Sequence, residues 1–143
     1  MDKILVTGGL GFIGSHTVVE LQNSGYEVII IDDLSNSSVD VLHRISTITG
    51  ITPKFEQIDL KNKAKVIDFF KRNKDLKGVI HFAASKAVGE STEQPLMYYE
   101  NNINTLVYVL QELKNSNHTN FIFSSSCTVY GQADELPITE KAP

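Results

Sequence analysis

The sequence is poor in cysteine and has no long apolar run. Cys127 is the only cysteine among 143 residues, so an internal disulfide is excluded and a reducing compartment, the cytoplasm, is expected. We expect this cysteine to be a small buried hydrophobe rather than a nucleophile. Glycines interrupt the apolar stretch near the N-terminus, which also lacks a preceding basic region. We therefore expect neither a signal peptide nor a membrane-spanning helix.

A strong excess of either charge is also missing, and we find no repeat or low-complexity tract. The formal net charge is −4, with 41% hydrophobic and 21% charged residues. This balance is typical of a globular domain and gives no reason to expect nucleic acid or a membrane as a partner. A chain of 143 residues is long enough for one domain with its own core.

The most informative stretch is a glycine cluster, T-G-G-L-G-F-I-G at 7–14. It follows the apolar run 3–6 and opens the helical segment 12–21, and its glycines at 9, 11 and 14 satisfy G-x-G-x-x-G. In this strand–turn–helix context the motif is typical of a dinucleotide-binding loop. The glycines allow a tight turn and close approach of the backbone to a pyrophosphate. Unpaired N–H groups at the start of such a helix attract an anion.

An acidic residue completes this fingerprint. Asp32 ends the next apolar run, 27–31, at the position where dinucleotide-binding folds place an acidic side chain. A carboxylate there accepts hydrogen bonds from ribose hydroxyls and repels a 2′-phosphate, and no arginine stands beside it. The sequence therefore predicts that the chain binds NAD rather than NADP.

Strand-like and helix-like segments alternate along the rest of the chain. We expect strands at 3–6, 27–31, 54–58, 78–83 and 120–124 and helices at 12–21, 39–49, 64–71 and 96–114, with loops at 84–91 and 132–143. This alternation predicts an α/β fold, a Rossmann-like doubly wound parallel sheet with strand order 3-2-1-4-5. Ligands of such sheets bind beyond the carboxyl ends of the strands, where the polar candidates of this chain gather.

Some residues near these strand ends allow two interpretations. Asp59 either caps the helix at 64–71 or contributes to the ligand site. His81 lies inside an apolar strand, which favours a place in the core or behind the site over a catalytic one. Asparagines at 101, 102 and 104 are poor helix formers and indicate polar contacts.

Five apolar residues of the predicted helix at 96–114 recur at intervals of three and four, which predicts a face packed on the sheet. They are Tyr99, Ile103, Leu106, Leu110 and Leu113.

The glycine cluster resembles that of the extended short-chain dehydrogenase/reductase family, and the similarity extends from Lys3 to about Pro143. Three further segments are similar to the UDP-glucose 4-epimerases within this family: H-F-A-A-S-K-A-V-G-E-S at 81–91, Y-Y-E-N-N at 98–102 and F-S-S-S-C-T-V-Y-G at 123–131. The run 86–91 discriminates best, because related sugar-nucleotide dehydratases carry other residues there. The chain departs from the pattern at Ala84-Ser85, where these epimerases often have a glycine and a larger apolar residue, and at Cys127, where they often have alanine.

The resemblance implies an NAD-dependent isomerase of galactose metabolism. Such an enzyme interconverts UDP-galactose and UDP-glucose through a 4-keto intermediate, because bound NAD+ takes a hydride from C4 and returns it to the opposite face. The UDP-hexose is the implied partner, with no metal. The resemblance implies that Ser126 binds the reacting sugar hydroxyl, as a substrate-binding and catalytic residue.

The cofactor positions that the resemblance implies fall into four groups. The pyrophosphate group is Gly8, Gly11, Phe12, Ile13 and Gly14. The adenosine ribose group is Asp32, Asp33, Asn36 and Ser37, and the adenine group is Asp59 and Leu60. The nicotinamide group is Phe82, Ala83, Lys86, Asn101 and Ser124.

The family's general base is missing from these residues. It is a tyrosine in a Tyr-x-x-x-Lys pair, and no tyrosine of this chain has a lysine four positions later. The lysine lowers the pKa of the tyrosine so that it can accept the hydroxyl proton. The resemblance thus describes residues 1–143 as an incomplete NAD-binding Rossmann domain, truncated after strand five, without the Tyr-x-x-x-Lys helix and the C-terminal UDP-sugar domain.

These absences lead to further expectations. We expect the 143-residue chain alone to be inactive and to self-associate through its open strand edge, and a full-length relative to be a homodimer. Two alternatives remain open: a non-catalytic NAD(H)-binding or regulatory module, and a related sugar-nucleotide epimerase or dehydratase.

Overall fold

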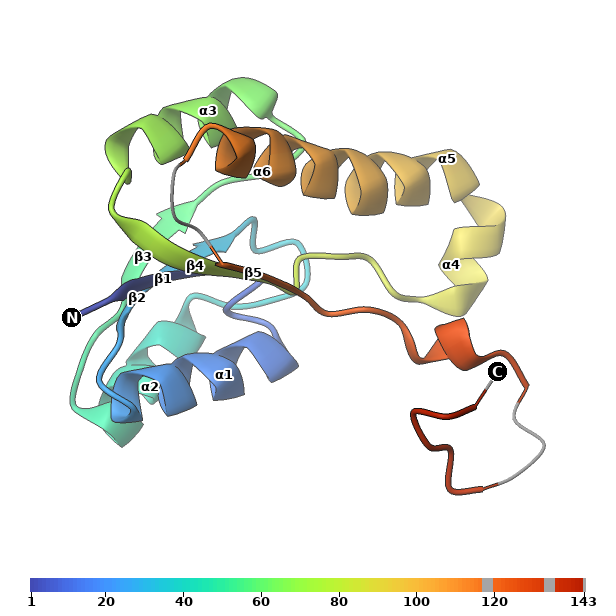
Figure 1. The fold of residues 1–143 in the computed structure, drawn as a ribbon, viewed down its shortest axis with the longest axis horizontal. Coiled ribbons are helices and arrows are strands. Elements are labelled where there is room, and N and C mark those ends of the chain that lie inside the picture. The colour runs from blue at the N-terminus through green and yellow to red at the C-terminus, as the bar shows by residue number, and fades with distance from the viewer. Residues whose placement is uncertain (117–119, 133–135, 143) are drawn as a thin grey trace.

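A five-stranded parallel sheet lies between two layers of helices (Figure 1) in the computed structural model, which describes residues 1–116, 120–132 and 136–142. The strands are β1 (Lys3–Thr7), β2 (Glu27–Asp32), β3 (Lys54–Gln57), β4 (Leu76–His81) and β5 (Asn120–Phe123). Their order is β3-β2-β1-β4-β5, and all neighbouring pairs are parallel. The predicted Rossmann-like fold and strand order are confirmed.

The central strand β1 positions the candidate site. Val6 pairs with Ile30 of β2 on one side and with Ile80 of β4 on the other. The chain leaves β1 toward β2 and later returns to its other side as β4, so the strand order reverses between β1 and β4. In doubly wound folds, the crevice at such a reversal, beyond the carboxyl ends of the strands, holds the ligand.

Helices α1 (Phe12–Asn23) and α2 (Asp40–Thr49) cover one face of the sheet, and α3 (Lys63–Arg72) and α6 (Thr105–Lys114) cover the other (Figure 1). Because strand side chains alternate between the faces, each layer has its own core. The core under α1 and α2 includes Val6, Val18, Val28, Ile30 and Ile45. The core under α3 and α6 includes Leu5, Ile29, Ile31, Phe69 and Val109.

The segment between β4 and α6 differs from the prediction. Helix α4 (Val88–Glu93) begins inside the stretch expected to be a loop, and α5 (Pro95–Tyr99) follows with its proline in the first turn, where a missing N–H costs least. The expected single helix at 96–114 consists of α5, the π-helical turn η1 (Glu100–Asn104) and α6. The loop prediction was wrong for residues 88–91.

The prediction that the five apolar residues of this helix pack on the sheet was also wrong for most of them. Tyr99, Ile103 and Leu110 are 63%, 48% and 41% exposed, whereas Val109 and Thr105 are 0% and 2% exposed. The apolar residues lie on both sides of the helix, and a polar residue, Thr105, occupies part of the buried side. A pattern of apolar positions alone therefore indicates the wrong face.

Asn62, rather than Asp59, caps helix α3. The side chain of Asn62 accepts a hydrogen bond from the Lys65 N–H at 3.2 Å. Asp59 lies outside the helix and accepts the Lys61 N–H at 2.9 Å, which closes a local turn. The capping interpretation of Asp59 was therefore wrong.

A single 3-10 turn, η2 (Cys127–Tyr130), follows β5. Residues 132 and 136–142 contain neither helix nor strand, as predicted, while 133–135, 143 and the side chain of Cys127 lie outside the described residues. Within the described ranges, no helix combines the length and apolarity needed to cross a membrane.

Candidate functional site

The turn between β1 and α1 is tight in two places. Gly8 has φ +66°, and a Cβ there would lie 2.8 Å from the backbone nitrogen of Ala83 at the end of β4. A Cβ at Gly14 would lie 2.8 Å from the Cα of Gly9. Only glycine fits at both positions, because the opposing atoms belong to the backbone and cannot rotate away. The loop is thus held closely between β4 and its own helix.

The N-terminus of α1 is left open for an anion. Its N-cap residue is Gly11, no side chain caps it, and its first turn contains no acidic residue. Phe12 and Ile13 point outward, with 79% and 55% of their surface exposed. The first N–H groups of a helix have no partner within the helix, and the dipole there favours negative charge. This geometry is suited to an anion, and the pyrophosphate expected from the glycine pattern is one.

Asp32 lies at the end of β2 and faces residues 7–14, here called the glycine loop. Its Oδ2 accepts the N–H of Leu10 at 3.0 Å. Its Oδ1 accepts the N–H of Leu34 at 3.0 Å and the hydroxyl of Ser37 at 2.7 Å. Asp32 is 8% exposed, and these hydrogen bonds tie the loop after β2 to the glycine loop. The sequence pattern indicated a ligand-binding group at this position and missed the structural function.

The turn that follows Asp32 contains an uncommon backbone conformation. Leu34 has φ +64°, the left-handed region that leucine rarely adopts. Its N–H donates to Asp32, and this hydrogen bond holds the residue in place. Strained residues of this kind occur often at binding sites, and no sequence signal identified this one.

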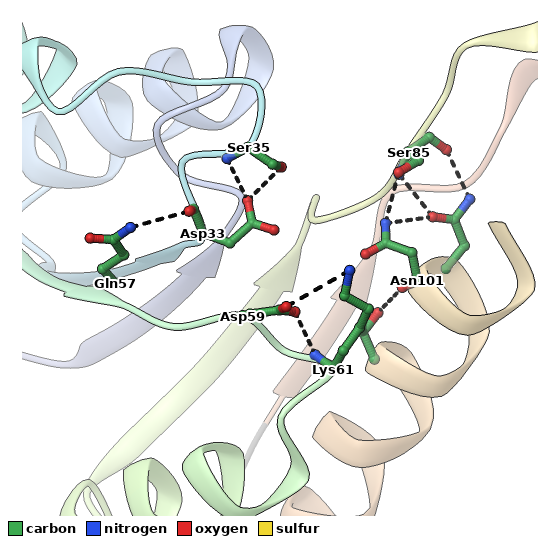
Figure 2. A network of polar contacts seen from close by, with 9 residues as sticks. Asp33, Ser35, Gln57, Asp59, Lys61, Ser85 and Asn101 are labelled. Carbon is green, nitrogen blue, oxygen red and sulfur yellow. Dashed lines mark hydrogen bonds and ion pairs between the residues drawn. The ribbon is translucent and has the colours of Figure 1, made fainter. Parts of the chain in front are cut away.

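The residues expected around adenosine lie beyond β2 and β3 (Figure 2). Asp33 accepts the N–H and the hydroxyl of Ser35 at 2.9 and 2.6 Å, and its carbonyl accepts from Gln57 at 3.3 Å. The carboxylate of Asp59 lies 3.7 Å from Lys61 Nζ. Asn36 is exposed. Leu60 is 5% exposed and belongs to the core, so its side chain faces the interior.

The end of β4 is tied to the glycine loop through a buried pair. Thr7 Oγ1 and His81 Nδ1 share a hydrogen bond of 2.8 Å, and the N–H of Ala83 donates to the same hydroxyl at 3.4 Å. The N–H of Phe82 donates to the carbonyl of Thr7 at 3.0 Å. His81 is 1% exposed, which places it in the core as expected. Its burial lowers the pKa of the ring to about 4.

The loop after β4 is bound to the π-helical turn. Asn102 bridges the backbone of Ser85, accepting its N–H and donating to its carbonyl, both at 2.8 Å. Asn101 donates to the hydroxyl of Ser85 at 2.9 Å (Figure 2). The asparagine cluster had indicated polar contacts, but the sequence did not identify Ser85 as their partner.

The remaining predicted residues have fewer contacts. Lys86 and Ser124 are exposed, and the N–H of Ser124 continues the β4–β5 pairing by donating to the carbonyl of His81. Ser126 caps η2, because its hydroxyl oxygen accepts the N–H of Thr128 at 3.2 Å. The chain after β5 leads away from the sheet (Figure 1).

Comparison with known proteins finds relatives of this chain among the UDP-glucose 4-epimerases. UDP-glucose 4-epimerase of Neisseria meningitidis serogroup B is 47% identical over 143 residues, which is 100% of this chain and 42% of that protein. The Haemophilus influenzae UDP-glucose 4-epimerase is 50% identical over 137 residues, with 96% of this chain and 40% of that protein covered. This chain thus spans about two fifths of the length of these relatives.

A crystal structure of Bifidobacterium longum UDP-glucose 4-epimerase in complex with NAD+ and UDP matches with a TM-score of 0.92 and 46% identity. The match covers 99% of this chain and 42% of that one. The model of the NAD dependent epimerase/dehydratase family matches residues 4–143. This protein chain therefore belongs to the NAD dependent epimerase/dehydratase family.

Proposed function

We propose that this chain is the NAD-binding part of a UDP-glucose 4-epimerase, which interconverts UDP-galactose and UDP-glucose through a 4-keto intermediate. The observation that carries the proposal is the pairing of an uncapped α1 N-terminus with Asp32, whose carboxylate lies 3.0 Å from the N–H of Leu10 in the glycine loop. The names of the relatives, and the NAD+ bound to the Bifidobacterium longum protein, support it.

The site residues divide by ligand group in this proposal. Residues 8 and 11–14 hold the pyrophosphate, 32, 33, 36 and 37 hold the adenosine ribose, and 59 and 60 lie at adenine. Residues 82, 83, 86, 101 and 124 line the nicotinamide end, where bound NAD supplies a hydride acceptor. Ser126 holds the sugar hydroxyl in the complete enzyme. These positions lie at or beyond the carboxyl ends of the strands, where this fold binds ligands.

We propose further that these 143 residues do not catalyse epimerisation alone. None of their tyrosines has the lysine partner that would make it a base near neutral pH. The UDP-hexose is therefore a partner of the complete enzyme, which we propose to be a cytoplasmic homodimer. Measured turnover of UDP-galactose by the pure chain would contradict this part of the proposal.

Calorimetric titration of the purified chain tests cofactor binding. We expect NAD+ and NADH to bind and NADP+ to bind at least about tenfold more weakly, because its 2′-phosphate meets the carboxylate of Asp32. Asp32→Ser should narrow this difference, and Asp40→Ser, which changes an exposed carboxylate at the start of α2, should leave it unchanged. Absence of NAD+ binding by a folded chain would contradict the proposal.

A second candidate is a non-catalytic NAD(H)-binding module, because no tyrosine among residues 1–143 has a lysine four positions later. The two differ in the codons that follow codon 143. An in-frame Tyr-x-x-x-Lys pair shortly downstream supports the enzyme, and a stop codon supports the module.

A further inference from the structure

The polar contacts between the loop after β4 and η1 determine which way two side-chain amides point. The N–H of Ser85 can only donate, so the atom of Asn102 that lies 2.8 Å away is an oxygen. The carbonyl of Ser85 can only accept, so the other terminal atom of Asn102, also at 2.8 Å, is a nitrogen. The backbone of one residue therefore fixes the orientation of the Asn102 amide.

That orientation fixes a second amide in turn. Asn102 Oδ1 lies 3.2 Å from a terminal atom of Asn101, which must be the nitrogen because an oxygen there would face another acceptor. The same nitrogen donates to Ser85 Oγ at 2.9 Å. The Asn101 backbone is held as well, since the Thr105 hydroxyl donates to its carbonyl. A rotated amide would break these contacts.

The oxygen of Asn101 is consequently directed away from the loop that holds its nitrogen (Figure 2). Within the described residues Oδ1 of Asn101 has no hydrogen-bond partner, and in Figure 2 it points away from Ser85. In the proposed function, Asp32 and the glycine loop hold the first nucleoside, which therefore lies on the β2 side of the crevice. A dinucleotide crosses the crevice at the strand reversal, so its second nucleoside lies on the β4 side, where the loop bound to Asn101 leaves the sheet.

We infer that Ser85 and Asn102 are positioning residues, which hold Asn101 so that its carbonyl oxygen accepts a hydrogen bond from the second nucleoside of a bound dinucleotide. This inference rests on the proposed function. The donor in the ligand is a ribose hydroxyl or a carboxamide N–H. Ser85 contributes through its hydroxyl, and the backbone bridge to Asn102 does not depend on its side chain.

Calorimetric titration of the 143-residue chain with ADP and with NAD+ tests the inference, because ADP lacks the second nucleoside. Ser85→Ala should weaken NAD+ binding roughly three- to tenfold, as expected for one neutral hydrogen bond, and leave ADP binding unchanged. Ser85→Thr, which keeps the hydroxyl, should restore most of the loss. Ser46→Ala removes a comparable hydroxyl contact, with Thr52 at 2.9 Å, near the opposite edge of the sheet and should change neither affinity.

The 3-acetylpyridine analogue of NAD+ identifies the donor, because a methyl group replaces its carboxamide nitrogen. If the wild-type chain binds the analogue more weakly than NAD+, and Ser85→Ala causes no further loss of affinity for the analogue, the carboxamide is the donor. If Ser85→Ala weakens both ligands equally, the ribose hydroxyl is the donor.

Two results would overturn the inference while the proposed function stands. One is an unchanged ratio of NAD+ to ADP affinity in Ser85→Ala, and the other is a wild-type chain that binds NAD+ no more tightly than ADP. Failure of a folded chain to bind either ligand would instead overturn the proposed function.

Discussion

His81 brings a titratable ring into the core beside the candidate site. It is 1% exposed, its ring centre lies 6.1 Å from that of Phe123, and its Nδ1 is bonded to Thr7. Its Nε2 has no hydrogen-bond partner among the described residues. Burial is the cause that lowers its pKa from 6.5 to about 4. A ring in these surroundings is neutral near pH 7, because nothing compensates the charge of a proton.

We predict that protonation of His81 destabilises the fold in acid. Between pH 6.5 and about 4 the unfolded chain binds a proton at this residue and the folded chain does not. The free energy of unfolding therefore has its highest value, with respect to His81, above pH 6.5. It falls by about 3 kcal/mol as the pH drops through this window. Urea unfolding at a series of pH values measures the fall.

Substitution of His81 distinguishes its contribution to the pH dependence of stability from that of the other groups that titrate in acid. His81→Gln should flatten the pH dependence between 6.5 and 4, while the same change at exposed His43 should leave it as in the wild type. If His81→Gln does not fold, the pKa of His81 can instead be measured in the wild-type chain by NMR titration of the ring. A His81 ring that titrates above pH 6 in the folded chain would contradict the prediction.

At the scale of secondary structure, α6 buries a face that its apolar pattern does not indicate. Val109 is 0% exposed and packs in the core under α3 and α6, whereas the adjacent Leu110 is 41% exposed. We predict that Val109→Ala lowers the free energy of unfolding by about 2 kcal/mol, through lost burial and the cavity left behind. Leu110→Ala, the larger truncation, should cost less than about 1 kcal/mol because its site is open to water.

Urea unfolding of both variants at pH 7 measures this difference. The two positions are adjacent in the same helix. Alanine improves helix propensity more over valine than over leucine, which works against the predicted difference, so a larger loss in Val109→Ala must come from burial. An equal or larger loss in Leu110→Ala would show that the originally predicted face is the buried one.

The sequence was sufficient to predict the sheet, but it was insufficient to predict the contacts between loops. Buried parallel strands are continuous apolar runs, such as 28–31, so their positions follow from the pattern. Their order follows from the alternation of strands and helices in a doubly wound fold. The glycine spacing likewise indicated the tight turn between β1 and α1, at Gly8 and Gly14. The three hydrogen bonds of Asp32 to Leu10, Leu34 and Ser37 could not be predicted, because they depend on how two loops meet in space.

The segment between β4 and α6 shows the same limit. Two successive asparagines of the π-helical turn contact one residue, Ser85: Asn102 contacts its backbone and Asn101 its hydroxyl. The three asparagines were a signal that this helix was unusual. Their partner lies sixteen and seventeen positions earlier in the chain, and no local pattern relates such positions.

At the scale of the whole molecule, β5 is an open apolar edge. Among the described residues it pairs with β4 alone. Ile122 and Phe123, whose side chains point to opposite faces, are 59% and 47% exposed. A cavity of about 260 Å³ lies beside the strand, and Ile4, Tyr26 and Ile122 contribute to its walls. Unpaired edges with exposed apolar side chains promote pairing between chains.

We predict that the 143-residue chain self-associates through this edge. Size-exclusion chromatography with light scattering should show a mean mass that rises with protein concentration. Ile122→Lys places a charge on the edge strand and should shift the onset of association to a concentration at least about tenfold higher, since a lysine resists burial between paired strands. Ile48→Lys changes an isoleucine of α2 that is 67% exposed and should leave the onset unchanged. A chain that stays monomeric at all concentrations, or an equal effect of both substitutions, would show that β5 is not the surface through which copies associate.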